Sequence, residues 1–167
     1  MVREDGTVIW CSENSYLDEN GVIQATLMDI TESRGNRERY ATLFEHAMDA
    51  MVIVDQDRVV QANQQAVTIF GGSEDDVATW TWIQGDQARV VREHTNTELL
   101  TIKMKQALHG DQHRASAVCQ RVDGTQFHAE LKINPLQEED HIRVCLTIRD
   151  VTERVLFERA IRESEER

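Results

Sequence analysis

Alternating apolar and polar residues near the end of the chain predict antiparallel strands. Over residues 127–133 and 142–148, apolar side chains recur at every second position, which is the spacing of a strand with one buried face. The Asp-Gly pair at 123–124 supplies turn residues before them and predicts a third strand over 115–121. The pattern therefore predicts a three-stranded meander. The apolar face of its hairpin is expected to include Leu131, Ile133, Val144 and Leu146.

The middle of the chain carries two further strand patterns and several helical ones. Short apolar runs over 51–54 and 58–61 predict two strands joined by a turn. Apolar residues at helical spacing predict an amphipathic helix along 40–48 and a longer helix over 95–108, while weak periodicity over 64–84 indicates short helices and loops. Five strands with these helices predict an α+β fold, in which helices cover one face of a five-stranded antiparallel sheet.

An internal repeat links the two ends of the chain. The sequence Arg-x-Asp-Gly-Thr occurs at residues 3–7 and 121–125, and Asp-x-Thr-Glu occurs at 29–32 and 150–153. Alternating stretches separate the two motifs in each copy. A helix is expected after each Asp-x-Thr-Glu, because its oxygen-bearing side chains can accept the free N–H groups of a first turn. The chain therefore contains two copies of one strand-strand-helix unit.

Charge and hydropathy narrow the choice of partners and location. The 167 residues include 30 acidic and 18 basic side chains, which gives a formal net charge of -12. Such a charge repels nucleic-acid phosphates and anionic lipid, so neither nucleic acid nor a membrane surface is expected as a partner. The apolar runs are shorter than the roughly 18 residues of a membrane span, and the start lacks a signal-peptide pattern. The expected location is the cytoplasm.

The sequence offers no catalytic or metal-binding constellation. The cysteines, Cys11, Cys119 and Cys145, are scattered and match neither a disulfide framework nor a zinc pattern. His109 and His113 have the spacing of zinc ligands on a helix, but a glycine between them indicates that the helix ends there. No phosphate-binding loop, serine-hydrolase or zinc-protease motif is present. We therefore expect no catalytic residue, no metal and no enzymatic activity.

Several segments, taken together in this order and spacing, resemble the PAS domain family with its C-terminal PAC segment. They are residues 43–55 (LFEHAMDAMVIVD), 60–66 (VQANQQA), 69–77 (IFGGSEDDV), 122–125 (VDGT) and 150–154 (DVTER). The resemblance covers essentially the whole chain. It implies a five-stranded antiparallel PAS sheet wrapped by helices around a small cavity, used for sensing, dimerisation and signal relay.

The resemblance also implies a domain organisation and a set of partners. Residues 1–33 correspond to the PAC-like strands of a preceding, truncated PAS domain, 34–153 to a PAS domain, and 154–167 to the start of a C-terminal signalling helix. PAS modules usually stand before histidine kinases or cyclic-di-GMP enzymes. We therefore expect a regulatory module of a multidomain signalling protein, such as a two-component system, with a downstream output domain, a homodimer and a small-molecule ligand.

The resemblance assigns roles to individual residues. Asp150 and Thr152 are expected to relay a change in the last strand to the exit helix, which would then change its pairing in a dimer. The residues expected to line the cavity are Asn63, Trp80, Trp82, Leu131, Ile133, Val144 and Leu146. Instead of lining the cavity, Asn63 could cap the following helix, and Trp80 and Trp82 could close the core.

A PAS cavity can hold heme, flavin, a small acid or nothing, and a module without a cofactor is the main expectation. Heme-binding members place a histidine some thirty residues before the Asp-Gly turn, and His94 stands 30 residues before Gly124, although its polar neighbours favour a solvated helix start. Trp80 and Trp82 could stack on a flavin. The alternative function is thus a heme- or flavin-binding redox or gas sensor. LOV-type photochemistry is excluded, because no cysteine lies near residues 74–84.

Overall fold

The computed structural model describes residues 1–17, 23–138 and 141–165, which form two compact units, residues 1–44 and 45–167. Each unit is described by itself. The last two residues of the predicted exit helix, 166–167, lie outside the described part. No helix among the described residues is both long and apolar enough to cross a membrane.

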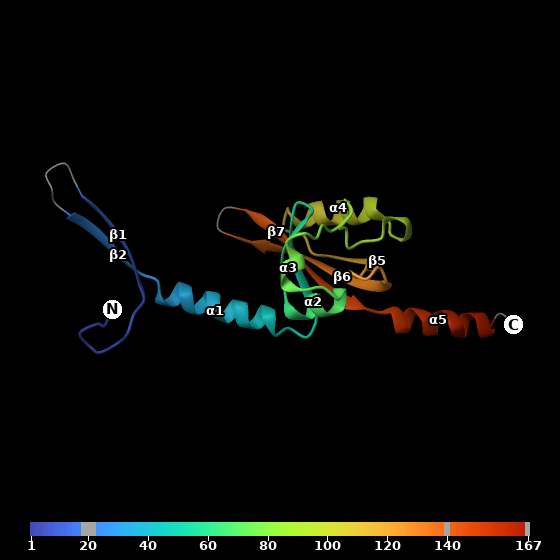
Figure 1. Cartoon of the computed structure of the whole chain (residues 1–167), viewed down its shortest axis with the longest axis horizontal. Helices are drawn as coiled ribbons and strands as arrows, with labels where there is room; N and C mark the ends of the chain where they lie inside the picture. The colour runs from blue at the N-terminus through green and yellow to red at the C-terminus, as the bar shows by residue number, and fades with distance from the viewer. Residues whose placement is uncertain (18–22, 139–140, 166–167) are drawn as a thin grey trace. The chain divides into compact units, whose positions relative to one another are not determined.

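The larger unit is built on a five-stranded antiparallel sheet, as predicted (Figure 1). Its strands lie in the order β4-β3-β7-β6-β5, so the last strand in the sequence occupies the middle of the sheet. Both β3 and β6 pair with this central strand. The strands are β3 (Ala50–Asp55), β4 (Arg58–Ala62), β5 (His113–Gln120), β6 (Gln126–Gln137) and β7 (Ile142–Asp150).

The strand register explains how the alternating sequence becomes a core. Leu146 on β7 lies opposite Val52 on β3 and Ile133 on β6, so the three side chains form one row on the same face. All three are fully buried, and Leu131 and Val144 also belong to the core cluster. The predicted inner face of the hairpin is therefore confirmed.

Helices cover this inner face. They are α2 (Gln64–Phe70), α3 (Glu74–Val77), the 3-10 helix η1 (Arg92–His94) and α4 (Thr97–Ala107). The helix predicted over 95–108 is α4, and it starts after Asn96, whose side chain accepts a hydrogen bond of 3.0 Å from the N–H of Leu99. Short helices also occupy the stretch where weak periodicity indicated them, as α2 and α3 show.

An aromatic cluster fills the core beneath α2. The ring of Phe70 lies 5.3 Å from Trp80, 6.5 Å from Trp82 and 5.6 Å from Phe127, measured between centroids. The chain passes close to this cluster at Gly72, where a Cβ atom would stand only 2.8 Å from the Trp80 ring. The absence of a side chain at this position is therefore a packing requirement.

The chain leaves the sheet through α5 (Thr152–Glu165), which begins directly after β7 (Figure 1). None of its described residues is buried. Phe157 and Ile161, four residues apart, are 67% and 44% exposed. The helix thus presents apolar side chains that nothing in the described chain covers.

The smaller unit contains a two-stranded antiparallel sheet followed by a helix, as the repeat predicted. Its elements are β1 (Cys11–Leu17), β2 (Ile23–Asp29) and α1 (Thr31–Glu45). The helical stripe expected along 40–48 is only partly right, because α1 ends at Glu45. The chain turns there so that Ala50 can join the sheet opposite Ile148, which leaves Met48 93% exposed instead of on a buried helix face.

Candidate functional site

Three side chains meet where the sheet gives way to the exit helix, and we call them the relay junction. Asp150 is the last residue of β7, Thr152 is the first residue of α5, and Arg121 follows the end of β5. The three side chains are therefore attached to three different elements. The Asp-Gly turn at 123–124 returns the chain beside β7, which is why Arg121 comes within reach of Asp150.

Hydrogen bonds connect these elements to one another. One carboxylate oxygen of Asp150 accepts a bond of 2.9 Å from the backbone N–H of Thr152, and the other accepts one of 2.9 Å from the Arg121 guanidinium. The hydroxyl oxygen of Thr152 accepts a bond of 2.9 Å from the backbone N–H of His128 on β6. The first turn of α5 is therefore fixed to both β6 and β7.

Arg121 extends the junction to the helical layer. Its guanidinium also donates to the carbonyl oxygen of Ile69, in the last turn of α2, and lies 4.3 Å from the centroid of the Phe127 ring. The backbone N–H of Val122 donates to the carbonyl of Phe70 at 2.8 Å. One guanidinium thus bridges the end of α2 and the carboxylate that holds α5.

The electrostatic balance at Asp150 favours its charged form. Partial burial acts to raise the pKa of this carboxyl, but the hydrogen bonds from Thr152 and the neighbouring Arg121 guanidinium outweigh it and hold the pKa below its ordinary value. The two side chains of the ion pair are 28% and 30% exposed. Because water screens such a half-buried pair less than a fully exposed one, its loss affects the local structure more.

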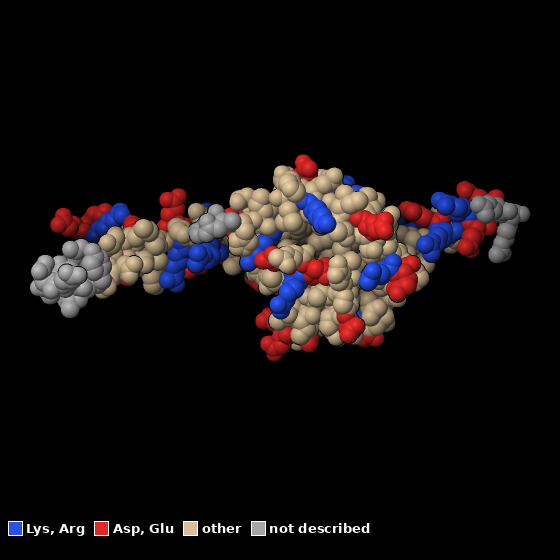
Figure 2. Space-filling view, turned by 90° about the horizontal axis from the view of Figure 1, so that it is seen from above, with Lys and Arg blue, Asp and Glu red and all other residues tan. Residues whose placement is uncertain are grey.

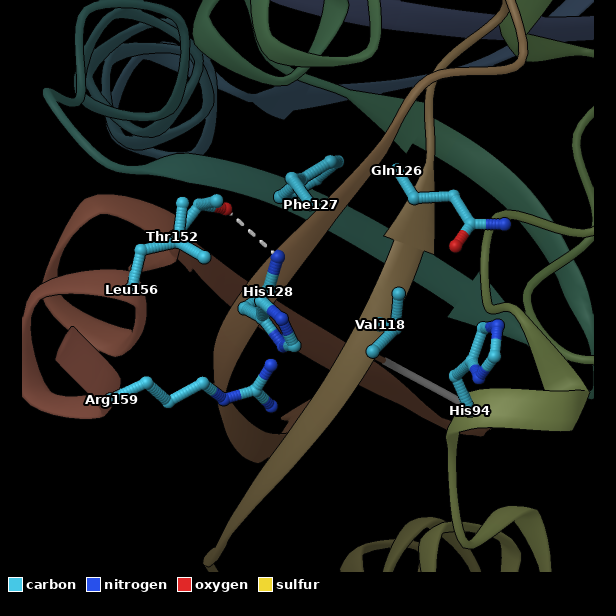
Figure 3. Close-up of a pocket in the computed structure, with 8 residues that line it drawn as sticks. All are labelled: His94, Val118, Gln126, Phe127, His128, Thr152, Leu156 and Arg159. Atoms are coloured by element: carbon cyan, nitrogen blue, oxygen red, sulfur yellow. Dashed lines mark hydrogen bonds between the residues drawn. The ribbon is translucent and has the colours of Figure 1, made fainter. Parts of the chain in front are cut away.

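A groove of about 420 Å³ opens beside the junction, between α5 and the outer face of the sheet (Figure 3). We call it the α5 groove. Arg159 extends from the helix toward His128, while His94 stands on the other side of Val118 (Figure 3). Its lining residues are His94, Val118, Gln126, Phe127, His128, Thr152, Leu156 and Arg159.

The outer face of the sheet carries charged side chains that pair locally. Arg143 contacts Glu138 at 2.7 Å and Asp55 at 3.2 Å, and Arg154 of α5 contacts Glu130 of β6 at 2.8 Å. Acidic and basic side chains are interspersed over the face of this unit that Figure 2 presents. The Arg154 pair adds a second tie between the first turns of α5 and the sheet.

Asn63 is a structural hub of the inner layer. Its side-chain oxygen accepts bonds of 2.9 Å from the N–H of Met51 and of Ala66, and its amide group donates to the carbonyl of Asp49 at 3.1 Å. It is the N-cap residue of α2 and is fully buried. The helix-capping interpretation is therefore confirmed, and the same side chain also fixes the start of β3.

The other predicted cavity residues lie in the core, and one of them reaches a surface cleft. Val144 lines a cleft of about 390 Å³ between α4 and the β3–β4 turn, together with Ile83 and Met104. Trp80 and Trp82 pack edge-on against Phe70, as core-closing residues do. The buried Nε1 of Trp82 has no hydrogen-bond partner among the described residues.

His94 does not face the core. It lies on η1, is exposed, and lines the α5 groove on the outer face of the sheet. It is therefore not placed to ligate a heme enclosed between the sheet and the helices. Among the described residues, no group of three histidine, cysteine, aspartate or glutamate side chains is arranged to hold a metal ion.

The structure brings Asp150 and Thr152 together and adds Arg121, which the sequence analysis did not single out. The repeat contained the signal, because both Arg-x-Asp-Gly-Thr motifs begin with an arginine and both copies end in Asp-x-Thr-Glu. Nothing in the spacing alone indicated that the guanidinium would reach the carboxylate 29 residues later.

Comparison with known proteins agrees with this architecture. The family model of the PAS domain matches residues 48–153, a range that includes the five strands of the sheet and the relay junction. Sporulation kinase E of Bacillus subtilis (strain 168) is 41% identical over 59 residues, which are 30% of this chain and 8% of that kinase. The chain thus matches only a small part of this relative.

Solved structures share the fold at low sequence identity. A domain of a sensory box sensor histidine kinase/response regulator from Geobacter sulfurreducens superposes with a TM-score of 0.56 at 18% identity, covering 71% of this chain and 97% of that one. The PAS domain of an HTR-like protein from Haloarcula marismortui gives a TM-score of 0.55 at 18% identity, covering 71% and 94%. With the family model matching more than half of its length, the chain belongs to the PAS domain family.

Proposed function

We propose that residues 34–167 form a sensory, non-catalytic module with its signalling helix, part of a multidomain signalling protein of the histidine kinase or cyclic-di-GMP type. The relay junction carries this proposal, because it connects the helical layer, the central strand and the exit helix through Arg121, Asp150 and Thr152. The similarity to a sporulation kinase and to domains of sensor kinases supports the kinase context.

The relay begins at the helical layer. A ligand or a partner contact that shifts α2 against the sheet moves the carbonyl of Ile69, to which Arg121 is bonded. The guanidinium then either keeps or loses its bond to Asp150. Since the Asp150 carboxylate accepts a bond from the first N–H of α5, the change passes from Ile69 to the exit helix through three successive contacts.

A ligand can drive such a change only if it binds one arrangement of the junction more tightly than the other. The equilibrium between the two arrangements shifts by as much as the two binding free energies differ. The cleft at Val144 supports a small molecule as the input, because it opens onto the core between α4 and the sheet. Occupation of this cleft would press on α4 and on β7, the strand that ends in Asp150.

The exit helix is the output. Exposed Phe157 and Ile161 support a homodimer in which α5 pairs with the α5 of a second copy, and a rotation of this pair is the signal passed to an output domain further along the polypeptide. We place this module in the cytoplasm, on the same side as the output domain that it would control.

The domain organisation follows the repeat. Residues 1–33 are the trailing strands of a second PAS domain, 34–153 are the sensory domain, and 154–167 begin the signalling helix. In the two-stranded sheet, Ile23 and Leu27 correspond by the repeat to Val144 and Ile148. The first pair is exposed whereas the second is buried, which supports β1–β2 as part of a larger sheet.

The proposal is tested by fusing the chain through α5 to the catalytic part of a histidine kinase and measuring autophosphorylation. Asp150→Ala and Thr152→Ala should each change the rate several-fold while the far-UV spectrum stays the same. Asp5→Ala is the matched control, because Asp5 accepts a similar bond from the N–H of Thr7 in a turn of the smaller unit that does not lead into a helix. Equal rates for the Asp150 variant and this control would contradict the relay.

A further inference from the structure

The α5 groove differs in charge from the rest of the molecule. The chain has a formal net charge of -12, with 30 acidic side chains and 18 basic ones. The residues that line this groove nevertheless include Arg159 and two histidines, His94 and His128, and no acidic side chain. A groove of this kind in an acidic protein is a local site that attracts anions.

The polar side chains of the groove are not engaged elsewhere. Four of them form no hydrogen bond or ion pair with any residue in the described part of the chain. By contrast, Glu130, which lies on the same face of β6 as His128, is already paired with Arg154 at 2.8 Å. The groove therefore offers donors whose acceptors are missing. The four side chains are His94, Gln126, His128 and Arg159.

These four side chains lie at two ends of the groove. His128 on β6 is directly opposite Val118 on β5, so both side chains point to the outer face of the sheet. Arg159 extends toward His128 on one side of Val118 (Figure 3). His94 and Gln126 lie on its other side (Figure 3). An apolar side chain thus separates two polar ends.

This arrangement fits a small organic molecule with an anionic group at each end. A guanidinium can donate to both oxygens of one carboxylate, and an imidazole next to it supplies a further N–H. An imidazole and a carboxamide at the opposite end can donate to a second carboxylate. A short hydrocarbon segment between the two carboxylates would then lie over Val118, where it loses contact with water.

Other classes of ligand fit the groove less well. A metal ion needs several histidine, cysteine or carboxylate ligands close together, and no such group of three occurs among the described residues. A nucleic acid needs a series of basic side chains along its phosphates, whereas Arg159 is the single arginine of this lining.

We propose that the α5 groove binds a short-chain dicarboxylate. One carboxylate lies between Arg159 and His128, and the other accepts hydrogen bonds from His94 and Gln126. This site is separate from the cleft at Val144, because the linings of the two share no residue.

The bound dicarboxylate connects the exit helix to the sheet. The hydrogen bonds at Thr152 hold the first turn of α5, whereas Arg159 lies about two turns further along the helix. A ligand held by Arg159 and His128 therefore attaches a longer part of α5 to β6. The site is thus an input that acts directly on the exit helix, and this consequence rests on the proposed function.

NMR titration of the 167-residue chain with glutarate, a short dicarboxylate, tests the site. The amide signals of residues 118, 128 and 159 should shift together. Arg159→Ala should weaken binding about five- to tenfold and His94→Ala about threefold, because each removes donors to a carboxylate. Arg162→Ala is the matched control, since it removes an arginine of α5 that does not line the groove. It should change the Kd by less than about 1.5-fold.

Two further ligands test the chemistry of the two ends. Butyrate has one carboxylate and glutaramide has none, so both should bind at least about fivefold more weakly than glutarate. Equal affinities for butyrate and glutarate would contradict a dicarboxylate. Unchanged glutarate binding in both Arg159→Ala and His94→Ala, or shifts scattered over the whole surface, would overturn the groove as the site.

The kinase fusion separates this inference from the proposed function. Glutarate should change the autophosphorylation rate of the fusion, and Arg159→Ala should reduce this response. If glutarate does not bind but Asp150→Ala still changes the rate, the groove site is wrong and the proposed function stands. If glutarate binds through Arg159 but neither glutarate nor Asp150→Ala changes the rate, the site stands and the proposed function fails.

Discussion

At the scale of single residues, Asn63 shows how one amide can join a strand to a helix. Backbone groups of Asp49, Met51 and Ala66 form hydrogen bonds with it, and they lie at the point where β3 and α2 come together. Because the side chain is fully buried, water does not replace its hydrogen bonds when the side chain is removed by mutation.

We therefore expect Asn63→Ala to lower the free energy of unfolding by about 2–4 kcal/mol, a lost cap plus a buried N–H without a partner. Asn96→Ala is the matched control, because it removes an exposed cap from α4 and should cost only about 1 kcal/mol. Urea unfolding of both variants measures the difference. If both variants lost the same free energy of unfolding, the hydrogen bond from the Met51 N–H to Asn63 would contribute little to stability.

The lowered pKa of Asp150 predicts how its contribution depends on pH. The hydrogen bonds from Thr152 and Arg121 outweigh the effect of burial, so the folded protein keeps this carboxyl charged at a lower pH than the unfolded chain does. Its contribution is therefore complete above the unfolded pKa, which is about 4, and is lost as the pH falls through the folded pKa.

The wild type should accordingly be more stable than Asp150→Asn by about 1 kcal/mol at neutral pH, and the difference should shrink as the pH falls below about 4. Denaturant unfolding at pH values of about 7 and 3 compares the two proteins. A difference that stays constant over this range would mean that the charge of Asp150 plays no part.

Residue roles were only partly accessible from the sequence. The helix-capping role of Asn63 follows from its position before an apolar helix. The family resemblance singled out Asp150 and Thr152, whose relay role stays a prediction. Arg121 depends on two contacts with residues far away in the chain, at Ile69 and Asp150, and no local pattern encodes such a meeting. The direction of the His94 side chain likewise depends on how η1 lies against β5.

At the scale of elements, the join between α2 and α3 depends on close packing. A Cβ at Gly72 would stand 2.8 Å from the Trp80 ring and 3.3 Å from a methyl group of Val122. The tryptophan is buried and held by Phe70, so it has little room to move. Gly35 lies within α1 and has open space around its Cβ position.

The same substitution should therefore have opposite effects at these two positions. Gly72→Ala is expected to lower the free energy of unfolding by about 1–3 kcal/mol through overpacking. Gly35→Ala should favour α1 by about 1 kcal/mol, because alanine is the better helix former. Urea unfolding measures the first, and hydrogen exchange along 31–45 the second. A Gly72→Ala protein as stable as the wild type would show that the Trp80 ring can move to accommodate the added methyl group.

Element types were predicted well where the pattern was long, and poorly where a neighbour decides the boundary. The strands over 126–137 and 142–150 and the helix over 97–107 match their periodicity. The stripe along 40–48 is helical only as far as Glu45, because pairing of β3 with β7 ends α1 early. Helix spacing describes a local preference, whereas this boundary is set by a contact about 100 residues away.

At the scale of the whole molecule, the exposed face of α5 predicts association. Burial of one phenylalanine or isoleucine side chain stabilises an interface by about 1.5–3 kcal/mol. Phe157→Glu or Ile161→Glu should therefore weaken a dimer about tenfold or more. Sedimentation velocity over a range of concentrations measures this.

Leu99→Glu serves as the control for this experiment, because Leu99 is similarly exposed but lies on α4. It should leave the association unchanged. A wild-type chain that sediments as a monomer at every concentration, or a Leu99→Glu variant that dissociates equally, would contradict pairing through α5.

The order of the strands has a further consequence. Since β7 is flanked by β3 on one side and β6 on the other, the polypeptide departs from the middle of the sheet and not from a margin. A twist introduced on either flank must pass through the strand from which the helix continues. The helix α5 can thus combine structural changes that begin at opposite edges of the sheet. Only a different strand order would shield it from changes at one of these edges.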